Sequence, residues 1–379
     1  NGATARRKKM SMATDPPARM PEASASSEQG ALTRAMTDLG GPALGRPLRG
    51  WWACFAVAVL ALAVGVVAVT YQLRTGIGTW GLNRSVGWAY DITNFVFWIG
   101  VGHAGTLISA ILLLFRQRWR VGVSRAAETM TIIAIVCAAI FPVIHLGRPW
   151  LMLWVLPLPN SRGPLWVNFS SPLTWDVFAI LTYFVVSLLF WYLGLLPDFA
   201  SLSHAATGWR RRVFGLLSLG WNGSLRTWAR YERTCLLLAG LATALVISVH
   251  SVVSFDFAAS LVPGWHTTIF PPYFVVGVIF SGMAMVLALL VVMRRAMALQ
   301  SYVTLQQLDA LCKIMLATSG LLGLAYLIET MTALYGNHGP DRFMLMLRMQ
   351  GPLAAYYWAM IACNVLVPQL LWSGRVRRN

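Results

Sequence analysis

Acid and base side chains lie at the ends of several separate apolar segments of this chain. An apolar segment ends at His145, within the run FPVIHLGRPW, Asp176 opens the next apolar segment, and Asp256 closes the one after it. Arg148 follows His145 closely, and Asp91 opens an earlier segment. Ionisable groups near a lipid boundary are costly, so they normally face a protein interior or a cavity and mark a pathway or a ligand site.

This set of groups suits a redox site that takes protons from a lipid-soluble quinol. Quinol oxidation needs two proton acceptors beside the ring oxygens, and a carboxylate with an imidazole supplies them. We expect Arg148 to hold a neighbouring aspartate ionised. Tyr183, seven residues after Asp176 on the same helical face, is expected to extend the hydrogen-bond chain. The alternative is an ion pair of His145 or Arg148 with Asp176 that serves only to fix helix packing.

A few more widely spaced polar residues, which we call the trail, lie deeper in the predicted spans than the acid and base cluster. The candidates for proton transfer along it are His103, Glu128, His250, Tyr326 and Glu329. Each also has a plainer interpretation, because polar groups inside a membrane bond helices to one another. Glu128 beside Arg125 fits an interfacial ion pair, and glycines 100, 102 and 105 around His103 are expected to permit close helix approach.

The composition is that of a polytopic membrane protein. The 379 residues are 57% hydrophobic and only 11% charged, with a mean hydropathy of +0.62. The net charge of +17 reflects topology rather than nucleic-acid binding, because cytoplasmic loops retain Lys and Arg.

Cysteine and histidine usage argues against a resident metal or redox centre. None of the five cysteines forms a CxxC or CxxCH motif, so covalent haem, iron–sulfur ligation and structural zinc are not expected. The histidines sit at unmatched depths along their segments, and His103 with His250 comes nearest to an axial haem pair. We therefore expect no haem and no metal in this chain, and an external electron acceptor.

The predicted fold is an all-α integral membrane protein, a bundle of about eight transmembrane helices with the N-terminus and C-terminus inside. Apolar runs of roughly 20 residues fall near 51–72, 91–115, 127–146, 173–196, 234–257, 269–293, 308–335 and 350–373. Of the 30 Lys and Arg, those on the outer side are Arg74, Arg84, Arg148, Arg162, Arg342 and Arg348. This asymmetry places both termini in the cytoplasm and the chain in a bacterial inner membrane.

The chain is expected to divide into a flexible basic cytoplasmic tail, residues 1–50, and a single membrane domain, residues 51–379. We also make a prediction for each of two loops between the spans. The outer loop 147–172, rich in Pro and Trp, is expected to pack as a cap over the helices. The inner loop 197–232 carries five arginines for which lipid headgroups are the simplest partner.

Several segments resemble the NrfD/polysulfide-reductase membrane subunits and, within that family, the ActC membrane protein of bacterial alternative complex III. They are FVFWIGVGHAGTLISAILLLFRQRWR at 95–120, RAAETMTIIAI at 125–135, FPVIHLGRPW at 141–150, SPLTWDVFAILTYF at 171–184 and the long run at 248–285. ActC proteins usually have more spans than the eight predicted here, which leaves open the contacts of the additional helices.

The resemblance implies a haem-free subunit that binds menaquinol or ubiquinol and oxidises it. Electrons would pass to an iron–sulfur subunit on the periplasmic face and onward to c-type cytochrome subunits, beside a second NrfD-like membrane subunit and lipids, with no nucleic acid. The site it implies comprises His145, Asp176 and Asp256, with Asp91 and Arg148 nearby. The positions that match family residues discussed for proton transfer are His103, Glu128, His250 and Glu329.

Three other functions remain open at this point. The trail could form a half-channel that translocates protons during the redox reaction. The same site could run in reverse and reduce quinone, as part of a polysulfide- or dimethyl-sulfoxide-reductase-like complex. The chain could also be a structural membrane anchor for an iron–sulfur subunit, in which case the polar cluster has no catalytic role.

Overall fold

The computed structural model describes residues 40, 45, 49–82, 87–156 and 171–378. Nearly all of the predicted tail, Arg84, Arg162 and most of the loop expected to form a cap lie outside the described residues. Within the described part every regular element is a helix, which confirms the all-α class. Eight of these helices are long and apolar enough to cross a membrane, as predicted.

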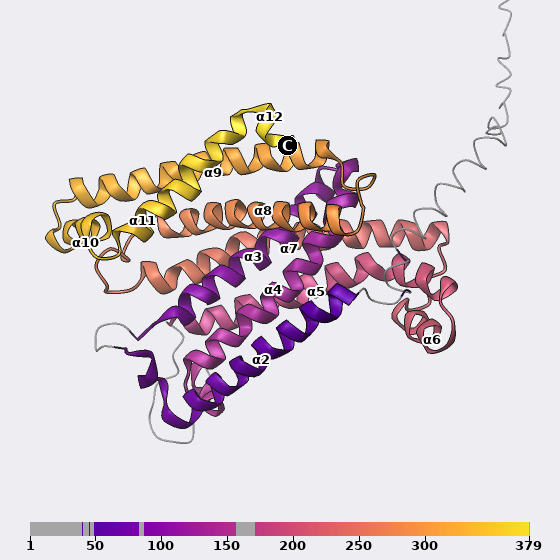
Figure 1. Ribbon diagram of the computed structural model, residues 1–379, viewed down its shortest axis with the longest axis horizontal. Helices are drawn as coiled ribbons and strands as arrows, with labels where there is room; N and C mark the ends of the chain where they lie inside the picture. The colour runs from indigo at the N-terminus through magenta and orange to yellow at the C-terminus, as the bar shows by residue number, and fades with distance from the viewer. Residues whose placement is uncertain (1–39, 41–44, 46–48, 83–86, 157–170, 379) are drawn as a thin grey trace, which may run out of the picture.

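The membrane-crossing helices follow one another along the chain (Figure 1). Seven are continuous: α2 (Arg49–Thr75), α3 (Tyr90–Leu114), α4 (Val121–His145), α5 (Pro172–Ala205), α7 (Leu225–Ala258), α8 (Phe270–Ala296) and α9 (Leu305–Tyr335). The eighth span, Ala354–Trp372, begins with α11 (Ala354–Ile361).

Helix α3 is the core of the bundle and packs against α4, α7 and α8. Of its most apolar window 72% is buried, against 33% for α4, α5 and α7, so α3 is the helix that the others surround. A Cβ at Gly105 would collide with the carbonyl oxygen of Ala127 on α4, and one at Gly102 would press on Ile135. These contacts confirm the predicted close approach at both glycines, whereas Gly100 makes only ordinary contacts.

Two helices are longer than the apolar runs that predicted them. Helix α5 continues to Ala205 and α7 begins at Leu225, with the short helix α6 (Gly208–Leu217) between them. Ser224 caps α7 by accepting a hydrogen bond from the Thr227 amide. Hydropathy finds only the apolar part of a helix, and here both helices extend past it into more polar sequence.

The last predicted span is interrupted rather than regular. Helix α10 (Gly339–Gln350) is separate from α11, which is followed by a π turn (Ala362–Leu366) and a 3₁₀ segment (Val367–Trp372). Pro368 lacks the amide proton needed to continue an α-helix, which accounts for the irregular stretch. The Asn364 carbonyl accepts a hydrogen bond from Ser319 of α9 (2.7 Å), so the irregular backbone remains bonded inside the protein.

Helix α2 and the basic groups lie at the margins of the bundle. Side chains along α2 are almost all exposed, and α2 is held at one end, where Gln72 donates to the Ile144 carbonyl (2.6 Å).

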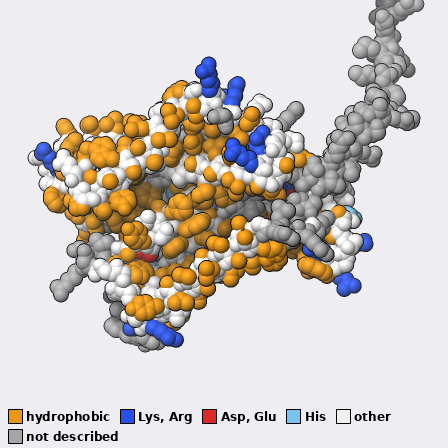
Figure 2. Space-filling view, in the orientation of Figure 1, with side chains coloured by type: hydrophobic (Ala, Val, Ile, Leu, Met, Phe, Trp, Pro, Cys, Tyr) orange, Lys and Arg blue, Asp and Glu red, His pale blue; other side chains and the backbone are white. Residues whose placement is uncertain are grey.

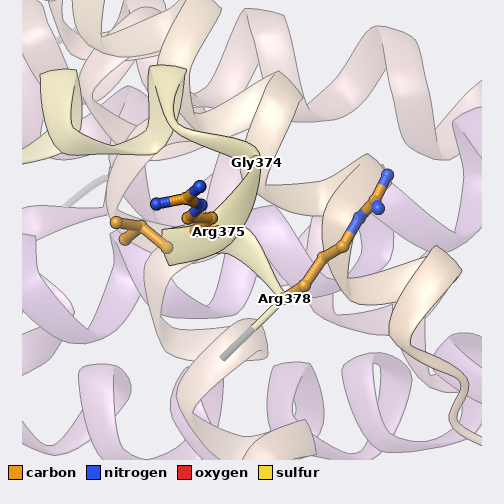
Figure 3. Close-up of a pocket in the computed structure, with 4 residues that line it drawn as sticks. Gly374, Arg375 and Arg378 are labelled. Atoms are coloured by element: carbon orange, nitrogen blue, oxygen red, sulfur yellow. The ribbon is translucent and has the colours of Figure 1, made fainter.

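Figure 2 shows a largely hydrophobic surface with Lys and Arg gathered over α6 and α12 (Gly374–Arg377). Figure 3 shows Arg375 and Arg378 at this C-terminal turn, directed away from each other beside a surface depression.

Candidate functional site

Four acid and base side chains from four different helices line one cavity of about 270 Å³. Asp91 comes from α3, His145 from α4, Asp176 from α5 and Asp256 from α7. The structure therefore brings together the three residues predicted to do chemistry and one of their predicted neighbours. We call this the first cavity, and the end of the bundle that holds it the His145 end.

His145 and Asp91 form a hydrogen-bonded pair in the first cavity. The His145 Nδ1 atom lies 2.5 Å from Oδ2 of Asp91, and the other carboxylate oxygen accepts from the Ala89 amide (2.8 Å). Asp91 lies in the first turn of α3, where unpaired backbone N–H groups favour a carboxylate. Both oxygens of Asp91 are thus engaged, and Nε2 is the His145 nitrogen that remains for a ligand.

Asp176 and Asp256 form the second pair in this cavity. Both side chains are buried and line the first cavity, and their carboxyl groups lie close enough to interact electrostatically. Oδ1 of Asp176 is buried and has no hydrogen-bond partner within the described residues. Buried polar atoms are normally paired, so an unpaired carboxylate oxygen beside the cavity marks Asp176 as a candidate proton acceptor. The alternative ion pair of His145 or Arg148 with Asp176 is not formed among the described residues, and His145 pairs with Asp91 instead.

Apolar side chains form the rest of the cavity wall and leave a lateral opening. The deep wall includes Phe95, which is buried. The lining residues Leu173 and Leu181 of α5 are 46% and 56% exposed, and Met152 is 46% exposed. The cavity therefore opens between α4 and α5 onto the apolar flank of the bundle. Pockets for drug-sized ligands measure about 300–1,000 Å³, so this cavity suits one ring system rather than a long isoprenoid tail.

The two other predicted pocket residues lie outside the first cavity. Arg148 is exposed and makes no ion pair with any described aspartate, so it does not hold one ionised as expected. Tyr183 is fully buried two helical turns below Asp176, and its hydroxyl donates to the Gly102 carbonyl (3.1 Å). It contacts the polar residues deeper in the bundle rather than the ligand space.

His103 and His250 lie side by side at the centre of the bundle. Their rings are 4.5 Å apart, and the Tyr183 ring lies 4.1 Å from that of His103. Both histidines are fully buried, and none of their four ring nitrogens has a hydrogen-bond partner within the described residues. The expectation of unmatched depths is therefore wrong for this pair. An axial haem would need its iron and porphyrin between the two rings, and rings in contact leave no space for them.

Polar side chains continue from this pair toward the opposite end of the bundle. Thr106 lies one turn from His103 on α3 and bonds Ser187 of α5 (3.4 Å). Ser109, one turn further, donates a short hydrogen bond to Glu128. The sequence predictions did not include these hydroxyl residues, although Thr106 and Ser109 follow His103 at helical spacing.

Glu128 sits at the far end of this polar line. It pairs with Arg125 (3.4 Å), as predicted, and Arg125 in turn binds Asp198 of α5 (3.0 Å). The Glu128 side chain is only 3% exposed, so it is buried in the bundle rather than set among headgroups. The charge on Arg125 is thus shared between a buried and a half-exposed carboxylate.

Tyr326 and Glu329 of α9 are not part of the His103–His250 line. With Thr330 they line a separate cavity between α8, α9, α10 and α11. Glu329 is bound there by Arg348 of α10 (2.6 Å), and the Tyr326 hydroxyl accepts from Asn364 (2.8 Å). Tyr326, Glu329 and Thr330 therefore lie on one face of α9.

Comparison with known proteins identifies relatives of this chain. Residues 79–379 match the family described as Polysulphide reductase, NrfD. The chain is 26% identical over 240 residues to a putative dimethyl sulfoxide reductase membrane subunit of Halobacterium salinarum, covering 63% of this chain and 50% of that protein. It is 23% identical over 239 residues to an Hdr-like menaquinol oxidoreductase integral membrane subunit of Archaeoglobus fulgidus, covering 62% and 49%.

A third relative has a similar degree of identity. It is a selenate reductase subunit of Mesobacillus selenatarsenatis, 23% identical over 248 residues, with 62% of this chain and 55% of that protein covered. The chain therefore spans about half the length of these curated relatives. All three are named as subunits of oxidoreductases, and two of them as membrane subunits.

Proposed function

The chain belongs to the NrfD polysulphide reductase family, and on that premise we propose that it is a quinol-oxidising membrane subunit of a multi-subunit electron-transfer complex. The observation that carries the proposal is the first cavity. Four acid and base residues from four helices meet there in a space sized for one ring. A purely structural anchor would not need an open cavity lined by these groups.

The two pairs in the cavity match the proton chemistry of a quinol. Oxidation of a quinol to a quinone releases two protons and two electrons. Nε2 of His145 accepts one proton, and Asp91 at Nδ1 orients the imidazole and stabilises its charged form. The second proton goes to the Asp176–Asp256 pair, which lines the cavity and includes a buried Asp176 oxygen with no hydrogen-bond partner among the described residues.

The surroundings of the cavity supply the route for the substrate. A quinol dissolved in the lipid enters sideways between α4 and α5, past the exposed side chains of Leu173 and Leu181. Its isoprenoid tail stays on the apolar flank while the ring occupies the cavity. Ubiquinol and menaquinol both fit this description, and the name of the Archaeoglobus relative favours menaquinol.

The acceptor lies on the His145 end in this proposal. Electrons pass from the ring to an iron–sulfur subunit docked on the periplasmic face and then to c-type cytochrome subunits, as in alternative complex III, with a second NrfD-like subunit alongside. The concentration of Lys and Arg at the opposite end supports a cytoplasmic location for that end. The names of the Halobacterium and Mesobacillus relatives favour the alternative, in which the site serves a reductase complex.

Substitution of Asp176 tests the proposal. With the complex assembled, Asp176→Asn should lower quinol oxidation by about 10²- to 10⁴-fold, the range for loss of a general base. Asp198→Asn is the matched control, because Asp198 lies at the other end of α5 and binds Arg125. Retention of full activity by Asp176→Asn would remove the aspartate pair from the reaction.

Proton transfer across the bundle is a second candidate function, favoured by a row of buried polar groups that leads from one end of the bundle toward the other. The line runs from the first cavity through His250 and His103 to Thr106, Ser109 and Glu128. In liposomes, Glu128→Gln should lower the number of protons moved per electron while quinol oxidation continues. Glu232→Gln is the control, because Glu232 is exposed on α7. An unchanged proton-to-electron ratio would contradict this function.

A further inference from the structure

A second cavity, of about 280 Å³, lies beside the first and is almost the same size. It is bounded by α8, α9, α10 and α11 and by the turn that follows α7. Its walls are dominated by aromatic rings, those of Phe257, Trp265, Phe270, Tyr273, Phe274 and Tyr357. Flat aromatic faces favour a planar guest through offset stacking, whereas an acyl chain needs only aliphatic contact.

The two cavities share one layer of aromatic side chains. Trp88 lines the first cavity, and its ring stacks on that of Trp265 at 5.4 Å and 26°. Trp88 also meets Phe257 edge-on at 5.4 Å, and Trp265 and Phe257 both line the second cavity. Phe257 directly follows Asp256 of the first cavity on α7. The cavities are thus back to back, one ring layer apart.

The charged side chains among the described lining residues of the second cavity form a single ion pair. Arg348 donates to Glu329 (2.6 Å) and to the Gly264 carbonyl (2.9 Å), and its guanidinium has further N–H donors. The second carboxylate oxygen of Glu329 can accept a hydrogen bond. The pair is neutral as a whole, so it suits an uncharged ligand group that accepts or donates hydrogen bonds. Quinone carbonyls and quinol hydroxyls are such groups.

We propose that the second cavity binds a second quinone or quinol ring, stacked between aromatic faces with one ring oxygen at the Arg348–Glu329 pair. This inference rests on the proposed function, because it takes the same class of ligand as the first cavity. A ring bound there lies one layer of aromatic side chains away from the acid and base residues of the first cavity. The second cavity has no counterpart of the His145–Asp91 pair among its described lining residues, so it is a binding site and not a second reaction site.

The number of bound rings is the quantity to measure. The purified complex containing the full chain is equilibrated with a radiolabelled short-chain naphthoquinone, and the bound probe is counted per chain. Thr330→Trp fills the second cavity, and the Thr330 hydroxyl bonds only its own helix, at the Tyr326 carbonyl. Leu327→Trp is the control, since Leu327 lies on the same helix and is 52% exposed. Ala139→Trp fills the first cavity.

We expect two probe molecules in the unchanged protein and in Leu327→Trp, and one in each of Thr330→Trp and Ala139→Trp. A single molecule that only Ala139→Trp displaces would overturn the second site and leave the proposed function intact. A single molecule that only Thr330→Trp displaces would instead refute the first cavity as the quinol site. Release of a phospholipid by Thr330→Trp, with no probe bound there, would identify a lipid as occupant and overturn the inference.

An azide-bearing naphthoquinone gives a check that needs no substitution. After illumination, labelled peptides should come both from α4 or α5, which border the first cavity, and from α9 or α10, which border the second. Excess unlabelled naphthoquinone should suppress both sets of labels. Labelling confined to α4 and α5 would count against the second site even if the Thr330 variant failed to fold.

Discussion

Replacing Asp91 by asparagine tests whether this residue acts through His145. Both Asp91 oxygens are engaged, one by the Ala89 amide and one by Nδ1 of His145, so the carboxylate positions the imidazole rather than contacting the substrate. An asparagine that keeps its oxygen on the Ala89 amide turns its NH₂ group toward Nδ1. Nδ1 must then accept a hydrogen bond, which places the proton on Nε2 and removes the base from the cavity.

The size of the effect follows from the bond that is lost. A hydrogen bond to a charged group contributes about 1.5–3 kcal/mol, which corresponds to about 10- to 150-fold in rate at about 1.4 kcal/mol per decade. Reversal of the imidazole tautomer costs more, up to about 10⁴-fold where an aspartate in the same role is replaced. We therefore expect kcat for quinol oxidation in Asp91→Asn to fall at least about tenfold, with KM for quinol little changed.

A double-mutant cycle separates positioning from a merely structural role. His145→Gln removes the base itself, and Asp91→Asn in that background should cost almost nothing further, because residues that act as one unit are not additive. The assay is steady-state quinol oxidation by the assembled complex with a soluble electron acceptor. If the two losses instead multiply in the double variant, Asp91 does not act through His145 and the reasoning fails.

Two further outcomes are expected from packing and from access. Gly105→Ala forces a methyl group into the α4 backbone and should lower the melting temperature of the purified protein, since overpacking costs about 1–3 kcal/mol. Gly240→Ala is the control, because open space surrounds Gly240, and it should not lower the melting temperature. Equal melting temperatures for the two variants would contradict the packing argument. Leu181→Trp narrows the lateral opening and should raise KM for a long-chain quinol several-fold, whereas Leu189→Trp, exposed elsewhere on α5, should leave it unchanged. An unaltered KM in Leu181→Trp would mean that substrate enters elsewhere.

The arrangement of the spans and the outer cluster were predictable from sequence for a simple reason. Hydropathy gives the ends of each helix, and ionisable residues at the ends of neighbouring helices are forced into the same layer. Asp91, His145, Asp176 and Asp256 all lie near such ends, and all four line the first cavity. Arg148 was misjudged because it follows the turn at Gly147, whose φ of 64° redirects the chain beyond the helix.

The depths of polar residues inside the bundle, and the side chains with which they pair, could not be predicted in the same way. Counting along helices placed His103 and His250 at different depths, yet their rings touch, because tilt and rotation are set by contacts that a single segment does not reveal. Glu329 was assigned to the same trail for the same reason. Its partner Arg348 belongs to α10, a helix whose sequence is too short and too polar to register as a span.

Under the proposed function, the geometry of the first cavity accounts for proton exchange with the quinol but does not decide the direction of electron flow. The groups that accept protons from a quinol also return them to a quinone, so Asp176→Asn should slow both directions by a similar factor. Direction is then set by the reduction potential of the partner protein. The relatives of this chain are named as subunits of a menaquinol oxidoreductase and of reductases, and a site that works in both directions would be compatible with either name. A variant that impaired only one direction would show that this chain itself, through a group outside the Asp176–Asp256 and His145–Asp91 pairs, biases the reaction.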